Sequence, residues 1–411
     1  MTTLVVAVFA ATYLGMALGR VPGLRVDRTG IALMALAVLL ASGALDIAGF
    51  AAAIDAPTIM LLFALMILSA QFAAAGFYDL CARAITTATA GPSGLLAMTV
   101  AVAGGLSAVL ANDIVVYAMT PLLIAGIAGR GRDPRPYLMA LVGAANAGSA
   151  ATIIGNPQNI LIGQVGRLDF WHFLLVCGLP ALAALVVVYV AVRVMWRREL
   201  AAIQYLPAEV GAAPAVDRGQ TMKAVVATVA MIALFATPLP REIGALAVAA
   251  ALLASRRLAS REVLGAVDWH LLLLFACLFA VTASFADTGI ARDALVWLEA
   301  RGVLPDRLAV LAPLALVMSN TIGNVPAVIL LMAVWPQPDA GALYGLALLS
   351  TLAGNFLIVG SIANLIVAER AAQAGVRLTF GDFARAGIPM TIVSLAIAVA
   401  WLGLGGWMRW A

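Results

Sequence analysis

Long apolar runs separated by short polar segments occupy the chain from end to end. An α-helix needs about 20 apolar residues to cross a bilayer, and ten of the runs reach or approach that length. The predicted spans are 4–19, 29–44, 58–75, 137–163, 170–195, 222–237, 242–255, 268–287, 341–367 and 387–407. The pattern predicts an all-α chain that crosses a membrane many times.

Two further apolar stretches, 93–128 and 305–335, are interrupted by polar residues near their middle. The interruptions are Ala111-Asn112-Asp113 and Ser319-Asn320-Thr321. Each arm has about 15–18 residues, which is marginal for a full span. We therefore predict that each stretch is a re-entrant helical hairpin, whose irregular tip is tolerated because protein or water surrounds it.

Two of the long spans also carry a polar break. The break at 155–159 combines Gly155, which tolerates unusual dihedrals, with Pro157, which lacks an amide donor. Residues 155–162 match residues 360–367, so a second break is expected at 360–364. We predict that 137–163 and 341–367 are helices broken near the membrane midplane.

The predicted elements occur twice in the same order. Five spans and a hairpin precede the polar stretch 196–220, and five spans and a hairpin follow it. An odd number of spans makes the second half enter the membrane from the opposite side. The sequence thus predicts inverted repeats at 1–195 and 221–411, joined by a linker at 196–220. Paired, interrupted hydrophobic segments in such repeats indicate a transporter's binding site.

Composition excludes a soluble fold, because 64% of the residues are hydrophobic and only 11% charged. The net charge of +4 does not indicate nucleic-acid binding, since the basic residues are dispersed in short loops. Eighteen of the 24 Lys and Arg residues fall on one predicted side of the membrane and six on the other. That bias makes the linker cytoplasmic and puts both chain ends outside, in a bacterial-type inner membrane. Three scattered cysteines and two histidines have neither disulfide nor metal-ligand spacing.

The polar groups at the four breaks are the candidate binding site, because amides and hydroxyls offer both donors and acceptors. The predicted substrate-binding residues are Asn112, Asn156, Gln158, Asn159, Ser319, Asn320, Thr321, Ser361 and Asn364. Asp113 is the one acid expected at mid-depth, and an intramembrane acid is a functional candidate by default. It is predicted to bind the coupling ion, with Asn112, Asn156 and Asn159 completing the oxygen shell if that ion is Na⁺. No cofactor and no other metal is expected.

These motifs resemble the ion transporter superfamily, which includes arsenite permeases, divalent anion/Na⁺ symporters, citrate transporters and a Na⁺/H⁺ antiporter branch. The resemblance rests on 112–114, 146–149 with 154–162, 319–320 with 324–326, and 360–361 with 364–366. It is greatest to the bacterial anion-permease branch near the arsenite permeases. It implies a scaffold and a moving transport region that holds both hairpins and both broken helices. Family symporters carry Ser-Asn-Thr at both tips, whereas Ala111 and Asp113 replace Ser and Thr at the first tip here.

The sequence therefore predicts a secondary active transporter of a small anion or oxyacid, arsenite-like, inorganic or carboxylate, coupled to H⁺ or Na⁺. A Na⁺/H⁺ antiporter is the alternative, and a membrane-embedded enzyme is a remote one because no catalytic cluster lies within the spans. No Walker motif is present, so ATP would act only through a separate subunit. The expected partners are the small-ion substrate and the lipid bilayer, with a homodimer left open and nucleic acid excluded.

Overall fold

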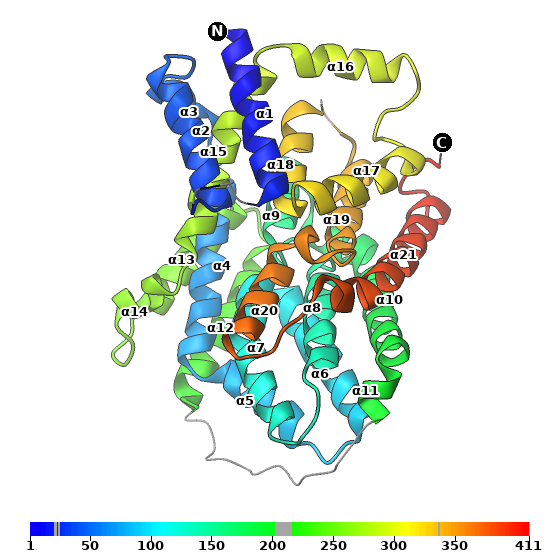
Figure 1. Ribbon diagram of the computed structural model, residues 1–411. Coiled ribbons are helices and arrows are strands. Elements are labelled where there is room, and N and C mark those ends of the chain that lie inside the picture. The colour runs from blue at the N-terminus through cyan, green and yellow to red at the C-terminus, as the bar shows by residue number, and fades with distance from the viewer. Residues whose placement is uncertain (20–22, 24, 202–215, 336–337, 411) are drawn as a thin grey trace.

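The computed structural model describes residues 1–19, 23, 25–201, 216–335 and 338–410, and these residues form helices joined by short loops. The helices of the first half are α1 (Thr2–Leu18), α2 (Arg28–Ala41), α3 (Ile47–Ala53), α4 (Ala56–Ala74), α5 (Phe77–Thr87), α6 (Pro92–Val109), α7 (Asn112–Ala128), α8 (Arg135–Ser149), α9 (Pro157–Val165), α10 (Phe170–Met195) and α11 (Arg197–Ala201). Figure 1 shows that no strand interrupts this helical architecture in the described part of the chain.

The second half repeats this order. Its helices are α12 (Arg218–Leu234), α13 (Arg241–Leu253), α14 (Ser260–Gly265), α15 (Trp269–Ala286), α16 (Ile290–Glu299), α17 (Leu308–Thr321), α18 (Asn324–Val334), α19 (Ala340–Ala353), the 3-10 turn η1 (Ile358–Gly360), α20 (Ile362–Gln373) and α21 (Phe380–Leu404). Elements α1 to α10 thus correspond one by one to α12 to α21.

The two halves run in opposite directions. In Figure 1, α4 descends to α5 at the bottom of the molecule, whereas its counterpart α15 rises to α16 at the top. Local sequence repeats as well, because Asp55 caps the start of α4 and Asp268 caps the start of α15. Gly76 and Gly289 adopt the left-handed conformation just before α5 and α16. The predicted all-α fold with two inverted repeats is confirmed.

Five of the described helices, α4, α6, α10, α15 and α21, are each long and apolar enough to cross a bilayer. The remaining apolar helices are shorter, and several of them are the predicted hairpin arms or the two parts of a broken helix. The hairpins consist of α6 with α7 and α17 with α18, joined by turns at 110–111 and 322–323. Short helices α3, α5, α14 and α16 were not predicted as separate elements.

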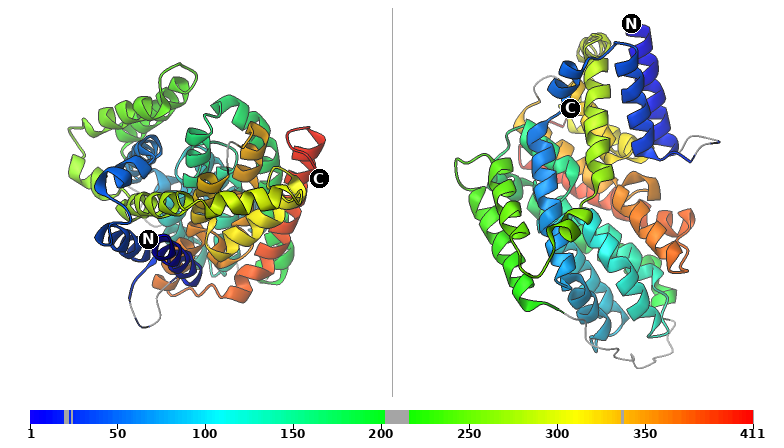
Figure 2. Two further views of the ribbon diagram at one scale, coloured as in Figure 1. Left: turned by 90° about the horizontal axis from the view of Figure 1, so that it is seen from above. Right: turned by 90° about the vertical axis from the view of Figure 1, so that its left-hand side faces the viewer.

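The core lies around the first parts of the two broken helices. Every residue of α8 from Pro136 to Ser149 is buried, as is every residue of α19 from Ala342 to Ala353. Both helices are surrounded by the hairpins and by α10 and α21. The N-terminal helices α1 and α2, dark blue in Figure 2, lie beside α15 at the edge of the molecule.

Helices extend into both ends of the predicted linker 196–220. Residues 197–201 form α11, and α12 begins at Arg218 after its cap Asp217. Residues 202–215 lie outside the described residues. The Asp217 carboxylate accepts a hydrogen bond from the Arg257 guanidinium at 2.9 Å, and this bond holds the pKa of Asp217 below its usual value. That contact ties the start of α12 to the loop after α13.

Candidate functional site

Both predicted breaks are present, but each lies a few residues earlier in the chain than predicted, so that 157–159 and 362–364 already belong to α9 and α20. The first is interrupted between Ser149 and Pro157, and the second between Ala353 and Ile362. Pro157 occupies the first turn of α9, where its missing N–H costs nothing. The Asn156 side chain caps this helix by accepting the Asn159 N–H at 2.9 Å.

One asparagine closes each break by the same pair of hydrogen bonds. The Asn159 amide donates to the carbonyls of Ser149 and Thr152 at 3.2 and 3.0 Å. The Asn364 amide donates to the carbonyls of Gly354 and Leu357 at 2.7 and 3.0 Å. In both halves the acceptors lie 10 and 7 residues before the asparagine. The two breaks are therefore equivalent structures, and each satisfies carbonyls that unwinding would leave unpaired.

Each half also supplies a side chain to the break of the other half. Asn146 on α8 donates to the Oδ1 atoms of Asn355 and Asn364 at 2.8 and 3.0 Å, and its own Oδ1 accepts from Ser361 at 3.2 Å. Reciprocally, the Thr351 hydroxyl on α19 donates to Asn159 Oδ1 at 3.3 Å.

Thr351 also accepts hydrogen bonds from the amides of Asn156 and Gln158, at 3.3 and 3.1 Å. Asn146 lies ten residues before Asn156, the N-cap of α9. Likewise, Thr351 lies ten residues before Ser361, the N-cap of α20. We call these exchanged contacts the crossed network. Because every member is buried, the network fixes the two broken helices to one another.

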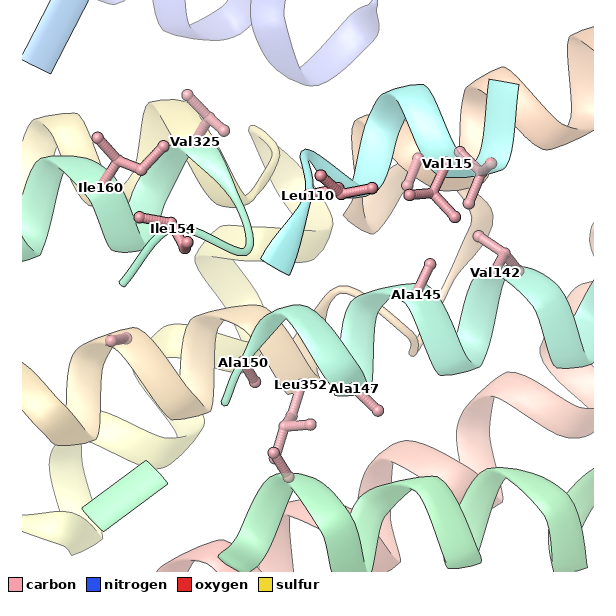
Figure 3. Packing of buried hydrophobic residues seen from close by; sticks show 14 of the residues in the cluster. Leu110, Val115, Val142, Ala145, Ala147, Ala150, Ile154, Ile160, Val325 and Leu352 are labelled. Atoms are coloured by element: carbon pink, nitrogen blue, oxygen red, sulfur yellow. The ribbon is translucent and has the colours of Figure 1, made fainter. Parts of the chain in front are cut away.

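The hairpin tips contact the same breaks. The Asn112 N–H donates to the Gly155 carbonyl at 3.2 Å, and the Asn112 amide reaches Asn146 at 3.4 Å. In the other half, the Asn320 amide donates to the Ala353 carbonyl at 2.9 Å, while its Oδ1 accepts from the Leu357 N–H at 3.0 Å. Figure 3 shows apolar neighbours of these contacts, with Leu110 at the first tip and Ile154 in the break.

Most of the predicted site residues meet in this assembly. Asn112, Asn156, Gln158, Asn159, Ser361 and Asn364 belong to it or contact it directly. Ser319 and Asn320 bind the end of α19, through the carbonyls of Ser350 and Ala353. Thr321 does not join them, because it is exposed and its hydroxyl donates to carbonyls of its own helix.

Three residues of the assembly, Asn146, Thr351 and Asn355, were not among the predicted site residues. For Asn146 and Thr351 the sequence did contain a signal, because each is a polar residue within an otherwise apolar, buried part of α8 or α19. The two interruptions, 111–113 and 319–321, pair Asn112 with Asn320 in the sequence. The helix ends correct this alignment. Asn112 begins α7 as Asn324 begins α18, so these two asparagines correspond, rather than Asn112 and Asn320.

A cavity of about 420 Å³ lies beside the first break. Asn156 and Pro157 form part of its wall, and most of the remainder is apolar, including Leu62 and Ile160. Two carboxylates, Asp113 on α7 and Asp268 at the start of α15, also line it. The lining residues include no Lys or Arg among those the structure describes.

The two carboxylates differ in their partners. Asp268 accepts the Leu271 N–H at 3.0 Å as a helix cap. Asp113 is half-buried, and no hydrogen bond or ion pair of its side chain is present within the described residues. Ionised carboxylates in an apolar space are costly unless a cation or proton compensates them. No group of three or more metal-ligating side chains was found in the described ranges. Asp268 was not predicted as a site residue, because it falls at the end of a span.

A second cavity, of about 860 Å³, adjoins the first and shares Tyr117, Asp268, Leu271 and Ile366 with it. Its other polar walls include Arg28 and Arg370, and the Arg370 guanidinium lies 4.0 Å from the centre of the Tyr117 ring. Because the two cavities share these residues, the second is continuous with the first. We call the second cavity the outer chamber. The arrangement can receive a small polar solute and hold a proton or cation beside it.

Similar proteins agree with this architecture. The silicon efflux transporter LSI3 of Oryza sativa subsp. japonica is 27% identical, over 93% of this chain and 94% of that protein. An uncharacterized transporter of Mycobacterium tuberculosis is 27% identical, over 100% and 99% of the two chains. The putative transporter arsB of Dictyostelium discoideum is 21% identical, over 92% and 87%.

The crystal structure of the YdaH transporter of Alcanivorax borkumensis has the same fold, with a TM-score of 0.59 at 14% identity over 98% of this chain and 97% of that one. Residues 8–342 match the citrate transporter family. These matches confirm the resemblance to the ion transporter superfamily, and they exclude the enzyme alternative. The chain belongs to the citrate transporter family and is a polytopic membrane transporter.

Proposed function

We propose that the protein is a secondary active transporter of a small oxyacid or anion, coupled to H⁺ or Na⁺. The observation that carries this proposal is the cavity that Asp113 and Asp268 line beside a broken helix. A compartment with apolar walls, a few polar groups and two carboxylates suits a small solute that moves together with, or against, a cation.

The charge of the cavity narrows the substrate class. A bare citrate or phosphate ion would meet two carboxylates and no basic side chain in the described lining. An oxyacid that is uncharged at neutral pH, such as arsenous or silicic acid, avoids this repulsion and hydrogen-bonds through its hydroxyls. The names of two relatives, a silicon efflux transporter and a putative arsB transporter, support the same class.

The hydrogen bonds of the break favour H⁺ as the coupling ion. The Oδ1 atoms of Asn156 and Asn159 already accept bonds from the Asn159 N–H and the Thr351 hydroxyl. Among the three predicted amide ligands, Asn112 alone retains a buried Oδ1 without a partner. A Na⁺ shell built on all three would share two oxygens that already accept a hydrogen bond, whereas a proton needs only the Asp113 carboxylate.

A Na⁺/H⁺ antiporter is the second candidate, and the absence of basic residues from the described lining favours it too. In that case Asp113 and Asp268 would exchange the two cations without another substrate. We place the protein in a bacterial-type inner membrane with both termini outside. Figure 1 accords with this, since both chain ends lie toward the top and α11 lies at the bottom. The homodimer stays a prediction.

Reconstitution in liposomes tests the proposal. Uptake of arsenite, silicate, phosphate, sulfate and citrate would be measured with an imposed pH gradient, with a Na⁺ gradient and with neither, against protein-free liposomes. We expect concentrative transport of an uncharged oxyacid driven by the pH gradient. Na⁺-driven proton movement without any added substrate would establish the antiporter instead, and citrate uptake with no oxyacid transport would overturn the substrate assignment.

A further inference from the structure

We take the helices outside the hairpins and the broken helices, among them α4, α12 and α13, as the scaffold. One end of the transport region is fastened to this scaffold in the structure. The Gln164 amide, at the end of α9, donates to Glu242 Oε2 at the start of α13, at 2.9 Å. The neighbouring Arg241 guanidinium donates to the Leu168 carbonyl in the loop after α9. Helix α9 also packs directly against α4. We call the Gln164–Glu242 and Arg241–Leu168 contacts the outer gate.

The inverted repeat assigns a counterpart to every residue of the outer gate. The relation that takes Asn159 to Asn364 takes Gln164 to Glu369 and Leu168 to Gln373. Arg241, the first residue of α13, corresponds to Arg28, the first residue of α2, and Glu242 then corresponds to Thr29. All four counterparts line the outer chamber of about 860 Å³.

The counterpart contacts are not formed. Within the described residues, Arg28 makes no hydrogen bond to Gln373, and its Nε is buried without a partner. The Thr29 hydroxyl donates to the His270 carbonyl at 3.3 Å rather than to Glu369. Helix α20 stands away from α15, with the outer chamber between them, although α9 contacts α4 at the equivalent place.

We propose that Arg28, Thr29, Glu369 and Gln373 form an inner gate that closes when the outer gate opens. In the closed inner gate the Arg28 guanidinium donates to the Gln373 carbonyl, and the Thr29 hydroxyl donates to the Glu369 carboxylate. The inference rests on the proposed transport function, because it supplies the second of the two states between which a transporter alternates.

The crossed network explains why the gates exclude one another. It joins α9 to α19 and α20 to α8 through buried side chains, so α9 and α20 belong to one rigid unit. A movement that brings α20 onto α2 therefore carries α9 away from α13. The two gates have the same composition, one guanidinium bond and one side-chain pair, so a substrate or ion that contacts the two states differently can shift the balance between them.

Cysteine cross-linking tests the inner gate. Cys81, Cys177 and Cys277 would be replaced first, and pairs introduced as Thr29→Cys with Glu369→Cys (the inner pair) and Gln164→Cys with Glu242→Cys (the outer pair). The control pair is Gln71→Cys with Gln220→Cys, whose native amides are hydrogen-bonded at 2.8 Å between α4 and α12, both within the scaffold. We expect the inner pair to cross-link in membranes, although in the present structure the outer chamber lies between α2 and α20.

Single substitutions at the gates then shift the equilibrium. Arg241→Ala removes a charged hydrogen bond from the outer gate, so the ratio of inner-pair to outer-pair cross-links should rise about tenfold. Arg28→Ala should lower that ratio, and neither should change the control pair. Failure of the inner pair to form beside a normal control pair, or yields of both gate pairs that rise together, would overturn the proposal. If the two gate pairs cross-link alternately but the protein moves none of the tested solutes, the gate proposal is supported. The transport assignment is then refuted instead.

Discussion

Asp113 combines partial burial, the absence of a partner within the described residues and a position in the wall of the inner cavity. Asp113→Asn keeps the size of the side chain and its hydrogen-bonding capacity but removes the titrating charge. We expect it to abolish concentrative transport, at least tenfold, while substrate exchange without a gradient persists.

Parallel uptake and counterflow assays in liposomes measure these two quantities for the Asp113 variant. Asp293→Asn, which changes an exposed acid on α16, serves as the matched control and should transport normally. Gradient-driven transport that is unaffected by Asp113→Asn would assign a structural role to this residue and place the coupling site elsewhere.

Asn146 hydrogen-bonds to four side chains of the site, which is more than any predicted site residue does. Asn146→Ala leaves the side chains of Asn355, Asn364 and Ser361 buried without this partner, so we expect a loss of about 1–3 kcal/mol in stability. The measurement is the unfolding temperature in detergent. Asn324→Ala is the control, because that buried side chain bonds only the adjacent Val325 N–H and its removal should cost less. Equal losses in the two variants would contradict the role given to the crossed network.

At the residue scale, the sequence predicted the amides at the breaks but not their partners. Gly155 and Pro157 mark an interruption by their own backbone chemistry, so Asn156 and Asn159 could be found without a structure. Asn146 and Thr351 lie within regular helix, and most of their contacts in the site are with residues more than 190 positions away. Thr321 lies outside the assembly, because it is the last residue of α17 and its exposed hydroxyl bonds carbonyls of that helix.

Helix packing beside the break depends on the absence of a side chain at Gly148. A Cβ there would lie 2.1 Å from the Gly104 carbonyl oxygen, where α8 crosses α6 of the first hairpin. Gly148→Ala should therefore push the hairpin from the broken helix and destabilise the protein by about 1–3 kcal/mol. Gly105→Ala, on the same hairpin arm but facing open space, should be neutral or slightly stabilising.

Thermal unfolding and uptake of the two glycine variants, compared side by side, check this packing. A Gly148→Ala protein with normal stability and transport would mean that the two helices do not approach as closely as described.

Whole elements were predicted well where hydropathy determines them. The predicted span 170–195 coincides with α10, and hairpin stretches 93–128 and 305–335 contain the pairs α6–α7 and α17–α18. Hydropathy did not separate α5 and α16, because these amphipathic helices are too short to read as spans. Nor could it align the hairpin tips, since the turn at 322–323 is defined by where α17 ends, which the sequence alone leaves open.

The orientation of the whole molecule follows from the charge bias and remains to be measured. Ala259→Cys, in an exposed loop on the predicted cytoplasmic side, should react with a membrane-impermeant thiol reagent only after the cells are opened. Ala300→Cys, exposed at the end of α16, should react in intact cells. The opposite labelling pattern would reverse the orientation, and the two positions serve as controls for each other.

For the whole molecule, counting the spans in each half was enough to predict the inverted repeat. An odd number of spans per half requires inversion whatever the individual boundaries are, so small errors at helix ends did not affect that prediction. The relative positions of α9 and α20 could not be obtained in this way. They differ between the halves although the sequence relation is the same, and the proposed alternation of the two gates accounts for this difference.

The crossed network has a consequence for biosynthesis. Asn156, Gln158 and Asn159 are made long before Thr351, which lies more than 190 residues further along the chain. While the ribosome is still translating the second half, the Gln158 amide and the Asn159 Oδ1 lack the Thr351 hydroxyl that they bind in the finished protein. The first half therefore reaches its final form only when α19 arrives, and a nascent chain truncated before Thr351 should be a substrate for membrane quality control rather than half a transporter.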